Sequence, residues 1–249
     1  MSAHGQRALP PVTDWALFLD VDGTLLEHAA RPDAVRVAAP VHQLLEALRL
    51  ATRGALALIS GRAIDDIDAL FAPLRLPVAG QHGAERRDAA GRLHRHQGAA
   101  EPVRRAAARL GAFAARHAGL VFEDKGHNLA LHYRQAPAAA QAAQAALRAA
   151  ALELGGDYEV LEGKMVVELK PAGRDKGRAI AEFMAEAPFA GRTPVFIGDD
   201  VTDEFGFGVV NRLDGHSVKV GPGASAARHR LADAAAVREQ LAQWAAQRA

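Results

Sequence analysis

The stretch Trp15-Ala-Leu-Phe-Leu-Asp20-Val-Asp22-Gly-Thr24 sets the organisation of the chain. Its first five residues are apolar, and so short a run bounded by polar residues predicts a buried strand. Asp20 and Asp22 lie one residue apart, so on extended backbone both carboxylates point to the same side. Gly23 supplies a turn, and the hydroxyl of Thr24 follows. Because open α/β sheets bind ligands at the carboxyl ends of their strands, this stretch predicts a site there.

Two simpler interpretations of the Asp-x-Asp-Gly pattern compete with this one. An Asp-Gly pair after a strand is often only a turn. A calcium-binding loop also begins Asp-x-Asp, but it needs its glycine at the sixth position and helices on both sides. Here the glycine is fourth and a strand precedes it, which excludes the calcium loop. The turn interpretation is weakened only if the rest of the chain supplies chemical partners for the carboxylates.

Composition excludes several classes of protein. The chain has 249 residues, of which 49% are hydrophobic, enough for one large domain or two smaller ones. A formal net charge of +1 gives no electrostatic case for nucleic acid or a membrane surface as a partner. No cysteine is present, so disulfides and thiolate metal sites are excluded. Residues 1–13 contain no long apolar segment, which disfavours a secretory signal, and no run approaches the length of a membrane span, so we expect a cytoplasmic protein. For the oligomeric state, a monomer is favoured.

Strand and helix patterns alternate in the first part of the chain. The expected elements are a loose tail over 1–12, a strand over 15–19, a helix over 33–52, a strand over 55–59, a helix over 63–71 and a strand with an exposed hairpin over 77–97. Such alternation is typical of a parallel sheet. It returns later as a helix over 175–186, a strand over 194–198, a helix from about Thr202, a strand over 217–220 and a helix over 234–247.

The middle of the chain breaks this alternation. We expect helices over 101–118 and 137–154, and strands over 119–124, 128–134, 158–162 and 165–170. Two antiparallel hairpins with helices on one face form a small α+β unit. The sequence therefore predicts an α/β fold with a doubly wound, Rossmann-like core. This core comprises residues 1–99 and 173–249, and an α+β domain of residues 100–172 is inserted between its two parts.

Polar side chains follow three of the predicted buried strands, at Asp20 and Asp22, at Ser60, and at Asp199 and Asp200. If the strands are parallel, their ends meet at one edge of the sheet. Oxygen ligands without histidine or cysteine suit a hard cation, and Mg²⁺ is the usual one. Acids are favoured near a helix start. The four acids within residues 199–204, however, would repel a nearby carboxylate pair strongly without a cation between them.

Lys176 breaks a local rule. It stands in Asp175-Lys176-Gly177 at a predicted helix start, where the helix dipole disfavours a cation and glycine is a poor helix former. Departures of this kind tend to mark function. The alternative is an ordinary solvated lysine. A lysine at this point would pair with the carboxylates and neutralise a bound phosphoryl group.

These four segments, in this order, resemble the motifs of the haloacid dehalogenase superfamily of phosphotransferases. They are Asp20-x-Asp22-Gly-Thr24, Ser60, Lys176 and Gly-Asp199-Asp200-x-x-Asp203. The inserted domain resembles the α/β cap of that superfamily. Within the superfamily, the chain is similar to the trehalose-6-phosphate phosphatases. The segments that carry this similarity are 60–62, 80–85, 123–125, 132–134, 162–164, 168–171 and 198–204, and it extends from about Trp15 to about Pro222.

The resemblance implies a two-step phosphomonoesterase that converts trehalose 6-phosphate to trehalose and phosphate. It makes Asp20 the nucleophile that forms an aspartyl phosphate. Asp22 then protonates the departing sugar oxygen and afterwards deprotonates the attacking water. Ser60 hydrogen-bonds a phosphoryl oxygen, and Lys176 offsets negative charge.

The resemblance also implies a bound Mg²⁺. Asp20, the carbonyl of Asp22 and Asp199 hold it. Asp200 and Asp203 either hold metal-bound waters or orient the lysine, and the sequence does not separate these two roles.

The expected sugar contacts lie at or beside two hairpin turns of the cap. A charged hairpin tip is ordinarily solvated, but two tips on the same side of one small sheet would face the active site together. Ionised groups suit a disaccharide rich in hydroxyls. We expect Glu123, Lys125 and Glu162 to contact the sugar, and Lys164 to be either a contact or a turn residue. The other substrate-binding candidates are Thr24, Gly61, Arg62, His82 and Arg134, of which His82 and Arg134 have structural roles as alternatives.

Other functions fit the sequence less well. A phosphatase for another sugar ester, such as sucrose phosphate, would share the core and differ in the cap. An isomerase similar to phosphomannomutase would return the phosphate to a sugar, and its metal loop usually differs from the one found here. A non-enzymatic binding module would be expected to lose Asp20 or Asp22. Nucleic-acid binding is disfavoured because no basic patch with interleaved aromatic residues is present.

Overall fold

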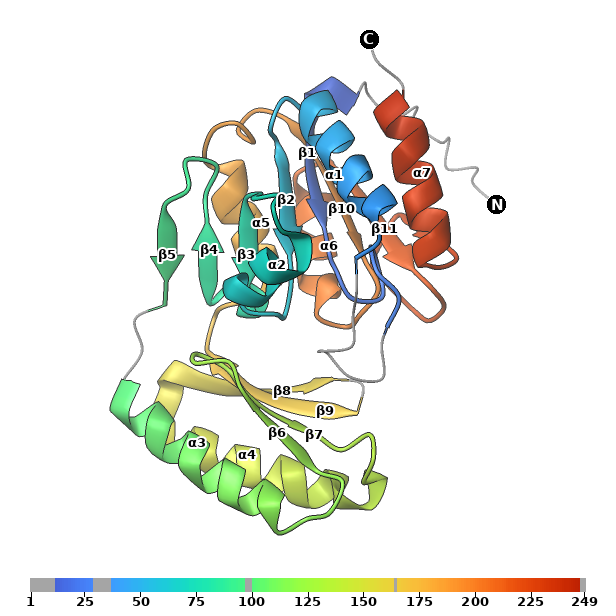
Figure 1. Cartoon of the computed structure of the whole chain (residues 1–249). Coiled ribbons are helices and arrows are strands. Elements are labelled where there is room, and N and C mark those ends of the chain that lie inside the picture. The colour runs from blue at the N-terminus through green and yellow to red at the C-terminus, as the bar shows by residue number, and fades with distance from the viewer. Residues whose placement is uncertain (1–11, 29–36, 97–99, 164, 247–249) are drawn as a thin grey trace.

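The computed structural model describes residues 12–28, 37–96, 100–163 and 165–246 (Figure 1). In this part of the chain the strands form two sheets. The larger has eight strands in the order β12-β11-β10-β1-β2-β3-β4-β5, and the smaller has four in the order β6-β7-β9-β8. Residues 1–11 of the expected tail, residues 33–36 of the expected first helix and the candidate residue Lys164 lie outside the described residues.

The large sheet is parallel except at one edge. Its parallel strands are β1 (Trp15–Leu19), β2 (Leu56–Ile59), β3 (Val78–Gly80), β10 (Thr193–Gly198), β11 (His216–Val220) and β12 (His229–Leu231). A hairpin of β4 (Glu85–Arg87) and β5 (Leu93–Arg95) adds an antiparallel edge. Strand β1 is central because it is apolar and buried along its whole length. The doubly wound core expected from the sequence is confirmed.

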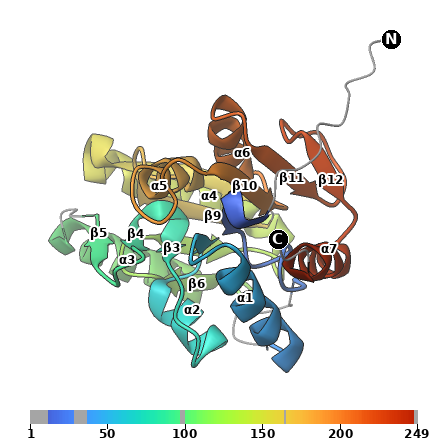
Figure 2. The ribbon, with the colours of Figure 1, turned by 90° about the horizontal axis from the view of Figure 1, so that it is seen from above.

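Helices cover both faces of the large sheet (Figure 2). On one face lie α1 (Ala39–Ala51), α2 (Ile64–Phe71) and α7 (Ala234–Ala246), and on the other lie α5 (Lys176–Met184) and α6 (Asp203–Arg212). The alternation of side chains along a strand separates two apolar cores. Leu17 and Leu19 pack in the first core, while Phe18 packs with a group of phenylalanines that includes Phe183 and Phe196 in the second.

The small sheet is antiparallel and has helices on one face only. Its strands are β6 (Val121–Asp124), β7 (Leu129–His132), β8 (Tyr158–Gly163) and β9 (Val166–Pro171). Helices α3 (Ala100–Ala115) and α4 (Ala140–Leu154) pack on it through a separate apolar core. The other face, here called the open face, turns towards the carboxyl ends of β1 and β2 (Figure 1).

Several predicted bounds change for physical reasons. The first helix begins at Ala39, because Pro40 occupies its first turn and Ala38 directly before it is extended. The helix expected over 175–186 ends at Met184, and the one expected over 137–154 begins at Ala140 after a short 3₁₀ turn. Strand β12 was not predicted, since three largely exposed residues carry no apolar pattern. Among the described residues, none of the helices has the length and apolarity needed to cross a bilayer.

The expectation that the two cap hairpin tips lie on the same side is wrong. Strand β7 pairs antiparallel with β9, so that Leu129 lies opposite Leu169 and His132 lies opposite Val166. The turn between β6 and β7 adjoins Leu129, whereas the turn between β8 and β9 adjoins Val166. The tips therefore lie at opposite ends of the small sheet. Of the charged groups that line the cavity, Lys125 comes from the β6–β7 turn, and Glu123 and Glu168 lie on strands β6 and β9.

Candidate active site

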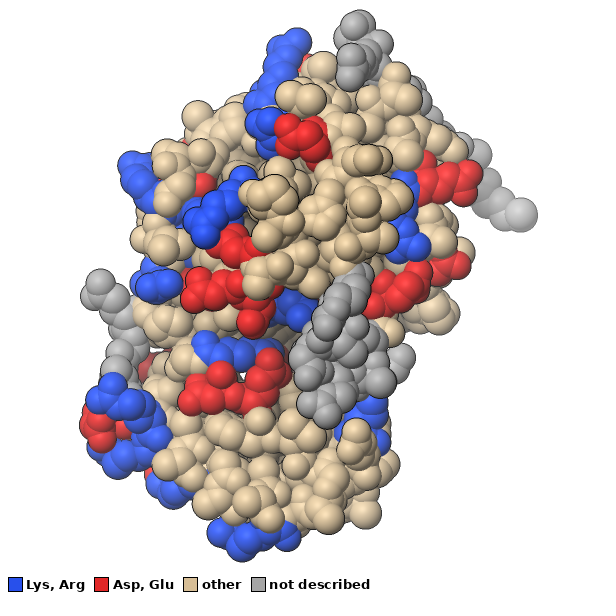
Figure 3. Space-filling view, viewed as in Figure 1, with Lys and Arg blue, Asp and Glu red and all other residues tan. Residues whose placement is uncertain are grey.

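A cavity of about 900 Å³ lies between the strand ends of the large sheet and the open face of the small one. Acidic and basic side chains gather along this junction in the space-filling view (Figure 3). Loops after β1, β2, β10 and β11 and the start of α7 form the core side of the cavity. Its lining includes Asp20, Asp22, Ser60, Arg62, Lys176, Asp199 and Asp200 from the core, and Glu123, Lys125, Arg134 and Glu168 from the cap.

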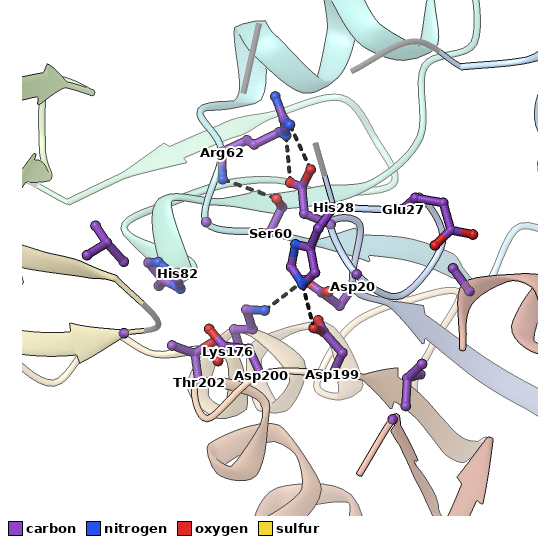
Figure 4. Close-up of a pocket in the computed structure, with 18 of the residues that line it drawn as sticks. Asp20, Glu27, His28, Ser60, Arg62, His82, Lys176, Asp199, Asp200 and Thr202 are labelled. Atoms are coloured by element: carbon purple, nitrogen blue, oxygen red, sulfur yellow. Dashed lines mark hydrogen bonds and ion pairs between the residues drawn. The ribbon is translucent and has the colours of Figure 1, made fainter. Parts of the chain in front are cut away.

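A buried ion pair lies at the floor of the cavity. Lys176 Nζ is 2.7 Å from Asp20 Oδ1 and 2.7 Å from Asp203 Oδ1, and the lysine side chain is only 3% exposed (Figure 4). Asp175 caps helix α5 by accepting from the backbone N–H of Arg178, which places Lys176 in the first helical turn. The alternative of a solvated surface lysine is therefore excluded.

Three carboxylates converge beside this lysine. Asp20, Asp199 and Asp203 each offer an oxygen, and these oxygens lie within 4.8 Å of one another. Asp20 Oδ2 is buried and has no hydrogen-bond partner among the described residues. Buried carboxylate oxygens left unpaired are costly, and an all-oxygen donor set suits a hard cation. The cluster thus fits a metal ion.

The pKa values of Asp20, Asp203 and Lys176 are all raised. Burial, helped by the neighbouring carboxylates of Asp203 and Asp199, raises the pKa of Asp20 well above its usual value in spite of Lys176. Burial also raises the pKa of Asp203. For Lys176, burial disfavours the ammonium form, but its two carboxylate partners outweigh burial and raise the pKa. The group carries more negative charge than one lysine neutralises, which is the situation that a cation relieves.

The loop after β10 is held in place by Asp203. Its Oδ2 accepts from the backbone N–H groups of Asp199 and Asp200, at 3.0 and 2.9 Å. Asp200 lines the cavity but is not part of the three-carboxylate cluster. Thr24 does not line the cavity: it is fully buried, and its hydroxyl donates to Asp199 Oδ1 at 3.3 Å. The expectation that Thr24 binds substrate is therefore corrected, because its hydroxyl orients a carboxylate instead.

Asp22 lies at the edge of the cavity, apart from the three-carboxylate cluster. Arg62 donates to both of its carboxylate oxygens, with Nε at 2.6 Å and Nη2 at 2.7 Å. The backbone N–H of Arg62 also donates to Ser60 Oγ at 3.1 Å. One arginine thus joins the ends of β1 and β2, a connection that the sequence motifs did not reveal.

The open face of the cap presents a second charged network. Lys125 Nζ lies 2.8 Å from Glu168 Oε1 and 3.7 Å from Glu123 Oε2. His132 Nε2 lies 2.7 Å from Glu123 Oε2, and His82 of the core lies 2.8 Å from Glu168 Oε2. These five side chains come from β6, β7, β9, the β6–β7 turn and one core loop, and they face the cavity.

In this cap network, nearby cations affect the pKa values of the carboxylates more than burial does. Burial alone would raise the pKa of Glu168, but Lys125 and His82 hold it well below its usual value. Burial is likewise overcome at Glu123, whose pKa is lowered mainly by the hydrogen bond with His132. Burial would lower the pKa of Lys125, and Glu168 and Glu123 raise it. The two carboxylates and the lysine of this network are therefore ionised at neutral pH.

A family model described as trehalose-phosphatase matches residues 18–237, which is most of the chain and includes both charged networks. The chain belongs to the trehalose-phosphatase family.

Known relatives agree with this assignment. The chain is 50% identical over 218 residues to the trehalose-6-phosphate phosphatase of Escherichia coli, covering 88% of this chain and 82% of that protein. It is 48% identical over 209 residues to a probable trehalose-phosphate phosphatase of Sinorhizobium fredii, covering 84% and 78%. The crystal structure of a trehalose-6-phosphate phosphatase related protein superposes with a TM-score of 0.81 at 25% identity, covering 92% of this chain and 96% of that one.

For this member of the trehalose-phosphatase family, the expected sugar contact Glu162 is corrected. Its carboxylate lies on the helix side of the small sheet, where Arg148 Nη2 and Gln144 Nε2 of α4 donate to it at 2.6 and 3.4 Å. Side chains alternate along β8, and it is Leu161 and Gly163 that line the cavity.

The carboxylate that the β8–β9 hairpin presents to the cavity is Glu168, which lies between the buried apolar residues Val167 and Leu169 on β9. The alternation of apolar and charged residues along β9 is the sequence signal that could have identified Glu168.

Two further residues beside the carboxylates were not predicted. His28 Nε2 lies 3.0 Å from Asp199 Oδ2, and this contact outweighs burial and lowers the pKa of Asp199. Lys219 of β11 donates to the carbonyl oxygen of the same aspartate. Gly23 has a φ of +87°, and a Cβ there would come within 2.3 Å of Asp199 Oδ2, so only glycine fits. None of these contacts follows from a sequence pattern.

Proposed function

We propose that this chain hydrolyses trehalose 6-phosphate to trehalose and phosphate. The observation that carries the proposal is the pairing of two unlike surfaces across one cavity. One is a carboxylate-rich floor with a nucleophile candidate, and the other is a cap face whose carboxylates are paired with lysine and histidine side chains. A cavity of about 900 Å³ also suits a disaccharide phosphate. Family membership and the names of the relatives support the same substrate.

The two surfaces belong to a division of labour between core and cap. Residues 1–99 and 173–249 form the core that handles the phosphate, and residues 100–172 form the cap that receives the sugar. Support for this division comes from the two sheets, since β6 to β9 lie in the inserted segment and have an apolar core of their own.

In the first step, Asp20 attacks phosphorus. Lys176 holds Asp20 Oδ1, which leaves Oδ2 as the oxygen without a hydrogen bond and hence the attacking atom. The bond between phosphorus and the sugar oxygen breaks as the bond to Asp20 forms. Asp22 gives its proton to the departing oxygen, and Ser60 and Lys176 hold the phosphoryl oxygens.

In the second step, water hydrolyses the aspartyl phosphate. Asp22, now ionised, takes a proton from the water, which attacks phosphorus and releases phosphate, and the Asp20 carboxylate is restored. Arg62 holds Asp22 through both oxygens when no substrate is bound. We infer that Arg62 moves to the phosphoryl oxygens when substrate enters, since a guanidinium pairs with phosphate in the same two-pronged way.

Asp20, Asp199 and the carbonyl of Asp22 would hold a bound Mg²⁺ at this end of the cavity, and Asp200 would act on it through water. When bound, it offsets the charge of the phosphoryl group and of the nucleophile. For Asp203 we favour the role of orienting Lys176 over that of holding a metal-bound water. Its side chain contacts Lys176 at 2.7 Å and accepts from two backbone N–H groups. The cytoplasmic location and the monomeric state stay predictions.

The test is phosphate release from trehalose 6-phosphate, sucrose 6-phosphate, glucose 6-phosphate and mannose 6-phosphate, each with Mg²⁺ and with chelator. We expect strong, Mg²⁺-dependent release from the trehalose ester alone. Faster release from another ester would keep the phosphatase chemistry and overturn the assigned sugar. No release from any ester would contradict the proposed function.

A further inference from the structure

A core loop directly beside the phosphate end of the cavity has an unusual backbone. Gln81, His82 and Gly83 have successive φ values of +49°, +55° and +93°. For the first two residues this left-handed conformation costs free energy, so the surrounding contacts must hold it. The loop follows β3 and is hydrogen-bonded to the residues after β2. The N–H of Gln81 donates to the carbonyl of Arg62 at 2.8 Å, and that of His82 donates to the carbonyl of Ser60 at 3.0 Å.

Gln81 reaches from this loop into the cap. Its Oε1 accepts from the backbone N–H of Asn128 at 3.0 Å, and Asn128 Nδ2 donates back to the carbonyl of Gln81 at 3.3 Å. Asn128 is fully buried, and its carbonyl accepts from the N–H of Lys125 at 2.9 Å. Gln81 Nε2 is itself held by Glu85 at 3.1 Å. A core side chain therefore fixes the turn that carries Lys125.

His82 reaches the other member of the cap ion pair. Its Nε2 lies 2.8 Å from Glu168 Oε2, while Lys125 holds Oε1 of the same carboxylate at 2.8 Å. The imidazole lies against Gly61: a Cβ at that glycine would come within 2.7 Å of His82 Nε2. The ring is nearly buried, at 8% exposure. It thus fills the space between the phosphate end of the core and the cap carboxylate.

We propose that Gln81 and His82 are positioning residues for sugar recognition. They set where Lys125 and Glu168 stand relative to the phosphate site, so the spacing between the phosphate and sugar subsites is determined by a core loop. This inference rests on the proposed function, because it takes Lys125 and Glu168 to meet the sugar. It gives both residues a role through the cap, whereas the sequence had offered His82 either as a direct substrate contact or as a purely structural residue.

The test compares two substrates in the full-length enzyme. Gln81→Ala and His82→Ala add no new backbone strain, because both native residues already carry a Cβ. We expect kcat/KM for trehalose 6-phosphate to fall about 10- to 100-fold in each variant, mainly through KM, as for the loss of a charge-assisted hydrogen bond. Turnover of p-nitrophenyl phosphate should fall by less than about threefold. His82→Gln should recover most of the loss, since its amide N–H replaces Nε2.

A double-mutant cycle shows whether His82 acts through Glu168. If it does, His82→Ala combined with Glu168→Gln should lose no more than about twofold beyond Glu168→Gln alone. Additive losses would overturn the inference, as would equal losses on both substrates. His94→Ala is the matched control, an exposed histidine on β5 away from the cavity, and should change neither rate. Failure of the wild type on trehalose 6-phosphate would instead refute the proposed function, and the cycle would then use the sugar phosphate that it hydrolyses fastest.

Discussion

The two sides of the cavity use the same motif, a lysine between two carboxylates, with opposite electrostatic results. In the core, Lys176 contacts Asp20 and Asp203, both at 2.7 Å, and the pKa of Asp20 is raised because burial and neighbouring carboxylates prevail. In the cap, Lys125 contacts Glu168 at 2.8 Å, and the pKa of Glu168 is lowered well below its usual value because cations prevail over burial.

This difference matches two different ligands. The core side has an excess of carboxylates, and Asp20 Oδ2 is buried without a hydrogen-bond partner among the described residues. A bound cation would stabilise this arrangement. On the cap side, the neighbouring cations lower the pKa of Glu168 and Glu123, so these ionised groups are available to hydrogen-bond a neutral, hydroxyl-rich sugar. The core side therefore performs the chemistry and the cap side selects the substrate. Core variants should lose activity on every phosphate ester, whereas cap variants should lose activity on the sugar ester only.

The largest effect is expected on the core side. Asp20→Asn removes the nucleophile and should reduce turnover of both trehalose 6-phosphate and p-nitrophenyl phosphate by at least about 10³-fold. Steady-state rates with both substrates measure this loss, and circular dichroism checks that the fold is kept. Appreciable activity in a folded variant would remove Asp20 as the nucleophile.

The cap side should affect only the sugar ester. Glu168→Gln keeps the shape of the side chain but removes its charge, and should reduce kcat/KM for trehalose 6-phosphate on the order of 10²-fold, with little change for p-nitrophenyl phosphate. Glu162→Gln is the matched control, because its carboxylate faces Arg148 on the opposite side of the sheet. A larger loss in the Glu162 variant than in the Glu168 variant would reverse the assignment of the two faces.

The lowered pKa of Glu168 gives a prediction for the pH dependence of stability. Since the folded-state pKa of Glu168 lies well below its usual 4.5, its ion pairs contribute stability above about pH 4.5, and this contribution is lost as the pH falls below that value. Glu168→Gln should cost about 2 kcal/mol at pH 7, the usual contribution of a hydrogen bond to a charged group. The difference from the wild type should shrink below pH 4.5 by up to about 1.4 kcal/mol per pH unit. Urea unfolding of both proteins across this range measures it, and a pH-independent difference would contradict the ion-pair account.

The smallest effect concerns the cation. Mg²⁺ at ten times its Kd should stabilise the protein by about 1.4 kcal/mol, which raises the melting temperature by roughly 3–6 °C. Asp199→Asn should weaken or abolish this shift, whereas Glu168→Gln should keep it, because only the core side needs a cation. Thermal melts with and without Mg²⁺ distinguish these results. A shift that depended on Glu168 would place the ion on the wrong side of the cavity.

The same comparison shows what could be predicted from the sequence. The motifs of the core side stand at strand ends, so the expectation of a parallel sheet places Asp20, Ser60 and Asp199 together at one edge, as the structure does. Short apolar runs likewise placed β1, β2 and β10, since a buried strand leaves a clear signal. The roles assigned to these residues stay predictions.

The cap side was harder because it depends on which face of each strand meets the helices. A shift of one residue changes the face, and so Glu162 was predicted where Glu168 is found. The two hairpin tips were misplaced for a related reason, since the strand order β6-β7-β9-β8 is not fixed by sequence. Long-range contacts such as that between Arg62 and Asp22 depend on loop geometry that no local pattern encodes.

The most direct test of the central claim is a crystal structure of Asp20→Asn with Mg²⁺ and trehalose 6-phosphate. The account predicts the phosphate beside residue 20 and Lys176, the ion among the core carboxylates, and the unphosphorylated glucose hydrogen-bonded to Glu168 and Lys125 on the open face of the cap. A sugar bound away from that face, or an ion held by cap residues, would contradict the division between the two sides of the cavity.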